Sequence, residues 1–80
     1  MITPATQENL DIFIKKVEIL SKHVNKADIA RVLWIAPPNL HKALEGNCSI
    51  RTYLNYNSIL DEYTREIIGD MERVLEIRRF

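Results

Sequence analysis

The sequence DIARVLWIAPPNLHKALEG, residues 28–46, holds two short amphipathic segments joined by a corner that contains two consecutive prolines. In the first segment Ile29, Val32 and Leu33 recur at three- and four-residue steps, the spacing of one face of a helix. The second segment ends at Gly46, and glycine commonly stops a helix at its C-terminal end. The pattern predicts two short helices joined by a tight turn, which is the arrangement of a helix-turn-helix.

Local signals predict where these two helices begin. Asn25 is a good N-cap for a helix over residues 26–33, because its side chain can accept a hydrogen bond from the first turn. Pro38 disfavours helical geometry in the residue before it, so Pro37 is expected to be extended. Pro38 then takes the first position of a helix over residues 38–45, where its missing N–H costs nothing.

Longer helical segments flank this pair. Apolar residues recur at helical spacing over about residues 6–24 and, more strongly, over about 58–79. Ser58 and Asp61 resemble a capping box, so the pattern leaves open whether a new helix starts at Ser58 or one helix runs on from Ser49. The predicted fold class is therefore all-α: a small four- to five-helix domain that contains a helix-turn-helix and ends in a long helix.

The composition is that of a single globular domain spanning residues 1–80. Eleven basic residues balance eleven acidic ones, but residues 22–47, which include the predicted helix pair, carry a net charge of +2. Cys48 is the only cysteine, which excludes an internal disulfide and indicates a reducing, cytoplasmic compartment. No apolar run approaches the about 20 residues of a membrane span, so we expect no membrane partner.

The stretch KADIARVLWIAPPNLHKALEG, residues 26–46, resembles the helix-turn-helix of the lambda-repressor-like family of phage repressors, Cro proteins and their bacterial relatives. In that family, apolar and small residues hold the two helices together, and a glycine follows the second helix. The positions that match are Ile29, Ala30, Leu33, Ile35, Leu40 and Gly46. The resemblance implies a five-helix plan and a sequence-specific DNA-binding transcriptional regulator of a bacterium or phage.

The chain departs from the family pattern at three places. Trp34 stands where the family usually has glycine, which eases a left-handed backbone, and we interpret this tryptophan as a core residue. Ala43 is small for the late apolar anchor of the second helix. Pro37 and Pro38 begin the helix that would read DNA, although their side chains have no hydrogen-bond donor.

The resemblance also implies how DNA would be contacted. The second helix would lie in the major groove, with Asn39 pairing with adenine and Lys42 with guanine or a phosphate. Lys26, Arg31 and Arg51 would hold the DNA backbone. The full set of expected DNA-binding residues is Lys26, Arg31, Pro38, Asn39, His41, Lys42, Glu45 and Arg51.

We expect a homodimer through the C-terminal helix, since one such module reads too few base pairs alone. The near-heptad stripe that predicts this contact is Tyr53, Tyr56, Leu60, Tyr63, Ile67, Val74 and Ile77. Packing of the same stripe on the first helix within one chain remains an equal alternative.

Two other functional readings stay open. A protein-interaction module or assembly subunit that keeps the fold without DNA binding is favoured by the zero net charge and by the prolines. An enzyme is not expected, because there is no glycine-rich phosphate loop and no recognisable nucleophile motif. No cofactor is expected, and the pair His41 and Glu45 is a weak candidate for a metal site.

Overall fold

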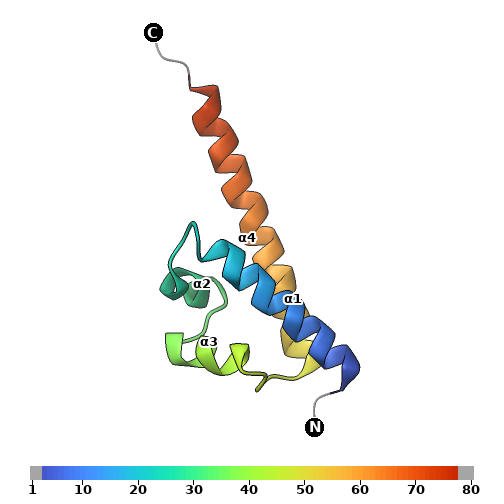
Figure 1. The fold of residues 1–80 in the computed structure, drawn as a ribbon. Coiled ribbons are helices and arrows are strands. Elements are labelled where there is room, and N and C mark those ends of the chain that lie inside the picture. The colour runs from blue at the N-terminus through green and yellow to red at the C-terminus, as the bar shows by residue number, and fades with distance from the viewer. Residues whose placement is uncertain (1–2, 78–80) are drawn as a thin grey trace.

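The computed structural model describes residues 3–77, and these residues form four helices with no strand (Figure 1). The helices are α1 (Pro4–Leu20), α2 (Lys26–Val32), α3 (Pro37–Leu44) and α4 (Ile50–Glu76). The all-α class with a long final helix is thus confirmed. Helix α1 crosses the first half of α4, the short helices α2 and α3 lie to one side of this pair, and the second half of α4 projects beyond them (Figure 1).

Three of the helices begin at a polar side chain that caps the first turn. The side-chain oxygens of Thr3, Asn25 and Ser49 accept hydrogen bonds from the backbone N–H groups three residues later, at 3.2, 2.8 and 3.3 Å respectively. The N-cap predicted at Asn25 is therefore confirmed. Each cap satisfies a donor that the helix itself leaves without a partner.

Helix α3 begins without a side-chain cap and one residue earlier than the sequence predicted. Ala36 is extended at φ −72° and ψ 149°, and Pro37 is already helical, so the expectation of an extended Pro37 was wrong. Proline has a φ close to that of a helix, and N–H groups of the first turn have no partner within the helix. Two consecutive prolines therefore fit the first turn, and together they remove two N–H donors from this helix end.

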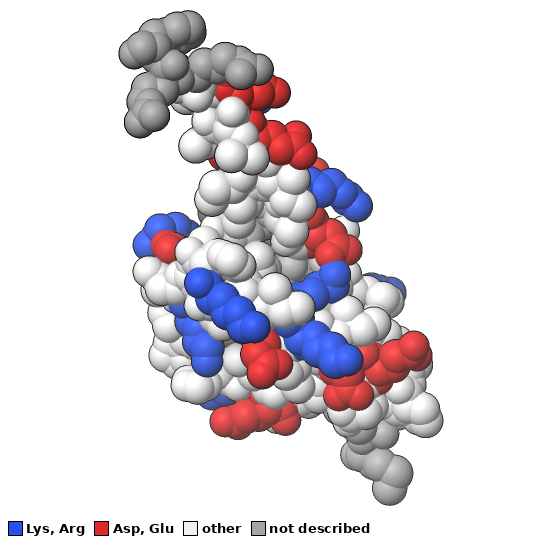
Figure 2. All heavy atoms as spheres, turned by 45° about the horizontal axis from the view of Figure 1, so that its top comes forward, with Lys and Arg blue, Asp and Glu red and all other residues white. Residues whose placement is uncertain are grey.

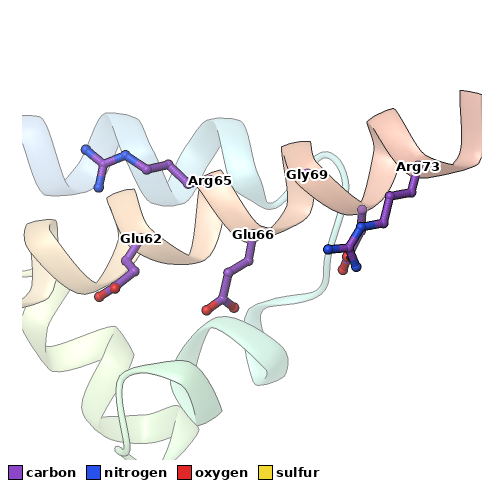
Figure 3. A pocket seen from close by; sticks show the side chains of 6 residues that line it. Glu62, Arg65, Glu66, Gly69 and Arg73 are labelled. Carbon is purple, nitrogen blue, oxygen red and sulfur yellow. The ribbon is translucent and has the colours of Figure 1, made fainter. Parts of the chain in front are cut away.

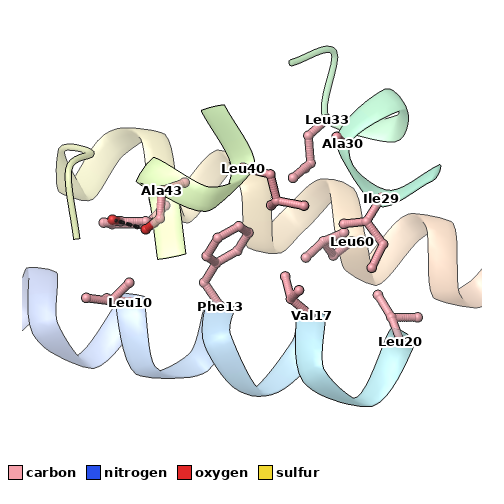
Figure 4. Packing of buried hydrophobic residues seen from close by; sticks show 11 residues of the cluster. Leu10, Phe13, Val17, Leu20, Ile29, Ala30, Leu33, Leu40, Ala43 and Leu60 are labelled. Carbon is pink, nitrogen blue, oxygen red and sulfur yellow. Dashed lines mark hydrogen bonds between the residues drawn. The ribbon is translucent and has the colours of Figure 1, made fainter. Parts of the chain in front are cut away.

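A single hydrophobic core joins all four helices (Figure 4). Phe13 of α1 lies at its centre, with its ring centroid 5.7 Å from those of both Tyr53 and Tyr56. Leu40 projects from α3 into the same space (Figure 4). The buried hydrophobic residues are Leu10, Phe13, Val17, Leu20, Ile29, Ala30, Leu33, Leu40, Ala43, Tyr53 and Leu60.

Helix α4 runs without a break from Ile50 to Glu76. The alternative in which a new helix starts at Ser58 was therefore wrong, because contacts with α1 hold this stretch in helical form. The side-chain amide of Asn57 donates to the carbonyl of Asn9 at 3.1 Å, and Asp61 pairs with Lys16 instead of capping a helix. The helix ends at Glu76 and Ile77 is extended, so the end predicted near residue 79 was too late.

The second half of α4 has no covering helix among residues 3–77. Every residue from 71 to 77 is exposed, and the 27-residue helix is about 40 Å long at 1.5 Å per residue. None of the helices between residues 3 and 77 combines the length and apolar character needed to cross a membrane.

Candidate nucleic-acid interface

The corner between α2 and α3 is a hydrogen-bonded helix cap. The N–H of Trp34 donates to the carbonyl of Arg31 at 3.1 Å, and the N–H of Ile35 donates to that of Ala30 at 3.0 Å. This pair of bonds is the Schellman motif, which requires a left-handed residue just after the helix. Trp34 supplies that residue with a φ of 62°. The cap closes α2 and turns the chain into α3.

The same cap occurs a second time, at the end of α3. The N–H of Gly46 donates to Ala43 at 3.1 Å, the N–H of Asn47 donates to Lys42 at 3.3 Å, and Gly46 has a φ of 96°. Glycine adopts this conformation without steric cost, whereas a side chain with a Cβ is strained there. The chain thus closes two neighbouring helices in the same way, once with glycine and once with tryptophan.

Trp34 is 91 % exposed, so its assignment to the core was wrong. Its neighbours Leu33 and Ile35 both pack into or against the core, and the cap leaves the side chain between them in solvent. Tryptophan is usually highly buried, and here neither the backbone conformation nor packing favours it. A strained residue that does not stabilise the fold is a candidate for a functional contact.

Replacing Trp34 with glycine is expected to stabilise the protein by about 1 kcal/mol, because it removes left-handed strain at no loss of packing. Gly46→Ala, at the equivalent position of the second cap, should destabilise it by a similar amount. Thermal melts of the two variants measure both effects, since about 1 kcal/mol moves the melting temperature by about 4–8 °C in a domain of this size. A lower melting temperature for Trp34→Gly would show that the indole stabilises the fold.

The outer face of α3 is free of contacts with the core. Pro38, His41, Lys42 and Glu45 follow each other at helical spacing and are all exposed. Leu40 and Ala43 on the opposite face are buried, as the two-helix pattern predicted for Leu40. Asn39 is exposed at the side of this stripe. We call these five exposed residues, Pro38, Asn39, His41, Lys42 and Glu45, the α3 face.

The three residues predicted to contact the DNA backbone lie at three separate places in the structure. Lys26, at the start of α2, lines a small hollow together with Pro37 and His41, so it lies beside α3. Arg31 is an exposed residue of α2 and forms an ion pair with Asp28 at 3.1 Å. The carboxylate of Asp28 partly neutralises the charge of Arg31. Arg51 is exposed in the first turn of α4. Of the three, only Lys26 lines a hollow together with residues of α3 in the part of the chain that the structure describes.

Tyr53 ties the end of α3 to α4. Its hydroxyl donates to the carbonyl of Ala43 at 2.6 Å and accepts from the N–H of Cys48 at 3.3 Å. Burial raises the pKa of Tyr53, so the hydroxyl keeps the proton that it donates. The sequence placed Tyr53 in the apolar stripe of the last helix, but no sequence signal indicated this polar role in positioning α3.

Surface charge is mixed in sign. On the face seen in Figure 2, Lys and Arg side chains gather near the middle of the body, and most Asp and Glu side chains lie around its edges. Among residues 3–77 no group of three or more His, Cys, Asp or Glu side chains could hold a metal ion, which leaves His41 and Glu45 as an isolated pair. The α3 face itself carries one lysine, Lys42, and one glutamate, Glu45.

Comparison with known proteins adds no relative: no family model, curated protein or solved structure matches this chain. The geometry of α2, α3 and the corner between them is therefore the basis on which a function can be proposed.

Proposed function

We propose that the protein binds double-stranded DNA through the α3 face and acts as a transcriptional regulator. The observation that carries this proposal is the arrangement of α3, which is anchored in the core by Leu40 and Ala43 while its other side is exposed and polar. An α-helix with its side chains is about 10–12 Å across, and the major groove of B-DNA is about 12 Å wide, so a helix such as α3 can enter it. The resemblance to lambda-repressor-like regulators assigns the same helix to this role.

The prolines shift the expected base contacts along α3. Pro37 and Pro38 remove two of the N–H groups with which a helix start can bind a phosphate. Base reading then depends on side chains further along, with Asn39 suited to adenine and Lys42 to guanine. Lys26 lies beside α3 and would hold a phosphate there, while Arg31 and Arg51 would contact the DNA backbone further away.

A single module of this size reads few base pairs, so we expect two copies to bind a palindromic site. The exposed second half of α4 is the surface that would join them.

A protein-interaction module is the second candidate, and a specific feature favours it. The corner presents Trp34, Ala36, Pro37 and Pro38, all exposed and all without charge. Tryptophan is enriched in the residues that contribute most to protein–protein binding. In a protein-interaction module the corner, rather than the α3 face, would bind the partner protein.

Salt dependence separates the two candidates. The test measures fluorescence anisotropy of a labelled pool of duplexes with a randomised 20-base-pair centre, over a series of salt concentrations. DNA binding through several phosphate contacts predicts an affinity that falls steeply as salt rises, and repeated selection from the pool should enrich a palindrome. Absence of binding at low salt, where phosphate contacts are strongest, would exclude the DNA proposal and favour the interaction module.

A further inference from the structure

The core is open to solvent where α1, the start of α2 and α3 meet. Two hollows of about 190 and 130 Å³ lie there, and they adjoin because Lys26 and Leu44 line both. We call the two hollows together the α1–α3 groove. Sites for small molecules usually enclose about 300–1,000 Å³, so the groove has room for one small ligand and is too small for a helix of another protein.

The lining of the groove is mainly apolar. The first hollow is lined by Ile14 and Val17 of α1, and the second is lined by Pro37 and Leu40 of α3. Val17 and Leu40 are core residues that point towards each other in Figure 4. Ile14 and Leu44 pack only partly against the core, so water reaches them. An apolar ligand in the groove would remove this surface from water, which favours binding.

Charge is distributed unevenly along the groove. Lys26 lines both hollows and has no ion-pair partner among residues 3–77. His41 lines the second hollow, where its imidazole can donate a hydrogen bond. Within the described part of the chain, Glu18 lines the first hollow and no acidic side chain lines the second. The second hollow is therefore the end that suits an anion.

We propose that the α1–α3 groove binds a small monocarboxylate with an apolar tail. The carboxylate accepts hydrogen bonds from Lys26 and His41 in the second hollow, and such charge-assisted contacts are stronger than neutral ones. The tail lies on Ile14 and Val17 in the first hollow. A neutral ligand would leave the charge of Lys26 unpaired, and Glu18 would repel a second anionic group at the far end of the tail.

A larger hollow of about 600 Å³, along residues 62–73 of α4, lacks these features. All of its lining residues come from α4, so no other element encloses a ligand there. In Figure 3 Arg65 points away from Glu62 and Glu66, so its charges do not converge on one point. The α1–α3 groove differs because three elements form its walls and core residues form its floor.

Occupancy of the groove has a consequence for DNA binding. Lys26 and His41 are also among the residues proposed to contact DNA, and Lys26 would hold a phosphate. A carboxylate that pairs with Lys26 competes with that phosphate, so each anion weakens the binding of the other by the same factor. This consequence rests on the proposed function, whereas binding of the carboxylate does not. The acid is expected to act as an effector that lowers the affinity for DNA.

Titration of the isotope-labelled protein with octanoate, followed through amide chemical shifts, tests the site. Octanoate has about ten non-hydrogen atoms, so we expect saturation with a Kd of about 1 mM and the largest shifts around Lys26, His41 and Leu44. Octanol has the same tail without the charge and should bind about tenfold more weakly. Equal binding of the two, or the absence of saturable shifts at these residues, overturns the proposal.

A pair of lysine variants tests the charged contact. Lys26→Met removes the ammonium group but keeps an apolar side chain, so the affinity for octanoate should fall about tenfold while that for octanol is unchanged. The matched control is Lys22→Met, at an exposed lysine in the turn between α1 and α2 that does not line the groove. An equal loss in two variants that are folded by circular dichroism would show that net charge attracts the acid, which overturns the role of Lys26.

Suberate, which carries a second carboxylate at the far end of the same tail, tests the orientation. It should bind the wild type more weakly than octanoate, and Glu18→Gln should reduce this difference because it removes the repelling charge. Suberate that binds the wild type as tightly as octanoate would overturn the placement of the tail beside Glu18.

The duplex-binding assay of the proposed function tests the effector role at constant ionic strength. Saturating octanoate should weaken DNA binding by the wild type about as much as Lys26→Met does, and it should have no further effect on that variant. Octanoate and DNA that bind without competition would overturn the effector role. If the wild type binds no duplex at low salt, the proposed function fails, and the titration without DNA still decides whether the groove binds the acid.

Discussion

Replacing Leu40 with alanine is expected to lower the free energy of unfolding by about 2–5 kcal/mol, the largest effect that we predict for a single substitution. Leu40 is 2 % exposed and projects from α3 into the space between α1, α2 and α4 (Figure 4). Alanine would leave a cavity there that the surrounding helices fill only in part. Small domains have about 5–15 kcal/mol of stability in total, so the loss is a large share.

Urea denaturation followed by circular dichroism measures this loss. The matched control is Leu54→Ala, the same chemical change at a residue that is 53 % exposed on α4, and its effect should be small. Equal midpoints for the two variants would contradict the placement of Leu40 in the core, and with it the anchoring of α3.

The double substitution of His41 and Lys42 with alanine is expected to weaken duplex binding at least tenfold. Both residues belong to the α3 face, and each specific contact to a base is worth about 1–3 kcal/mol. Alanine is a good helix former, so folding should not suffer. If Lys42 holds a phosphate, the dependence of affinity on salt should also become less steep by about one counterion.

The chain provides a matched control for this experiment. Lys22 and His23 form the same pair of residue types, are exposed, and lie in the turn between α1 and α2. Alanine at both should remove the same charge from the protein without changing affinity beyond a small general effect. If the two double variants weaken binding equally, the effect comes from net charge, and the α3 face is not the surface that reads DNA.

Much of the fold could be predicted from local sequence signals, because these act within a few residues of one another. The cap at Asn25, the stop at Gly46 and the spacing that buries Ile29, Leu33 and Leu40 all depend on helical geometry alone. The eight DNA-contacting residues that the resemblance implies are all exposed in the structure. Whether they bind DNA remains a prediction.

Tertiary contacts decided the features that local signals left open or indicated wrongly. Ser58 and Asp61 have the residue types of a helix start, yet Asp61 pairs with Lys16 and Asn57 bonds to Asn9, so α4 continues through them. Trp34 is a large apolar residue, which favoured burial, but the cap that closes α2 leaves it in solvent.

The sequence by itself determined the all-helical class, the turn between α2 and α3, and the apolar side of α4, since each follows from residue types at fixed spacing along the chain. Only the tertiary structure decided which part of that apolar side is covered. Residues such as Leu60 and Val74 have the same periodicity, but α1 packs over the first and does not reach the second. Burial depends on the lengths and crossing of helices distant in sequence, and a repeating pattern within one helix carries no information about where its neighbour ends.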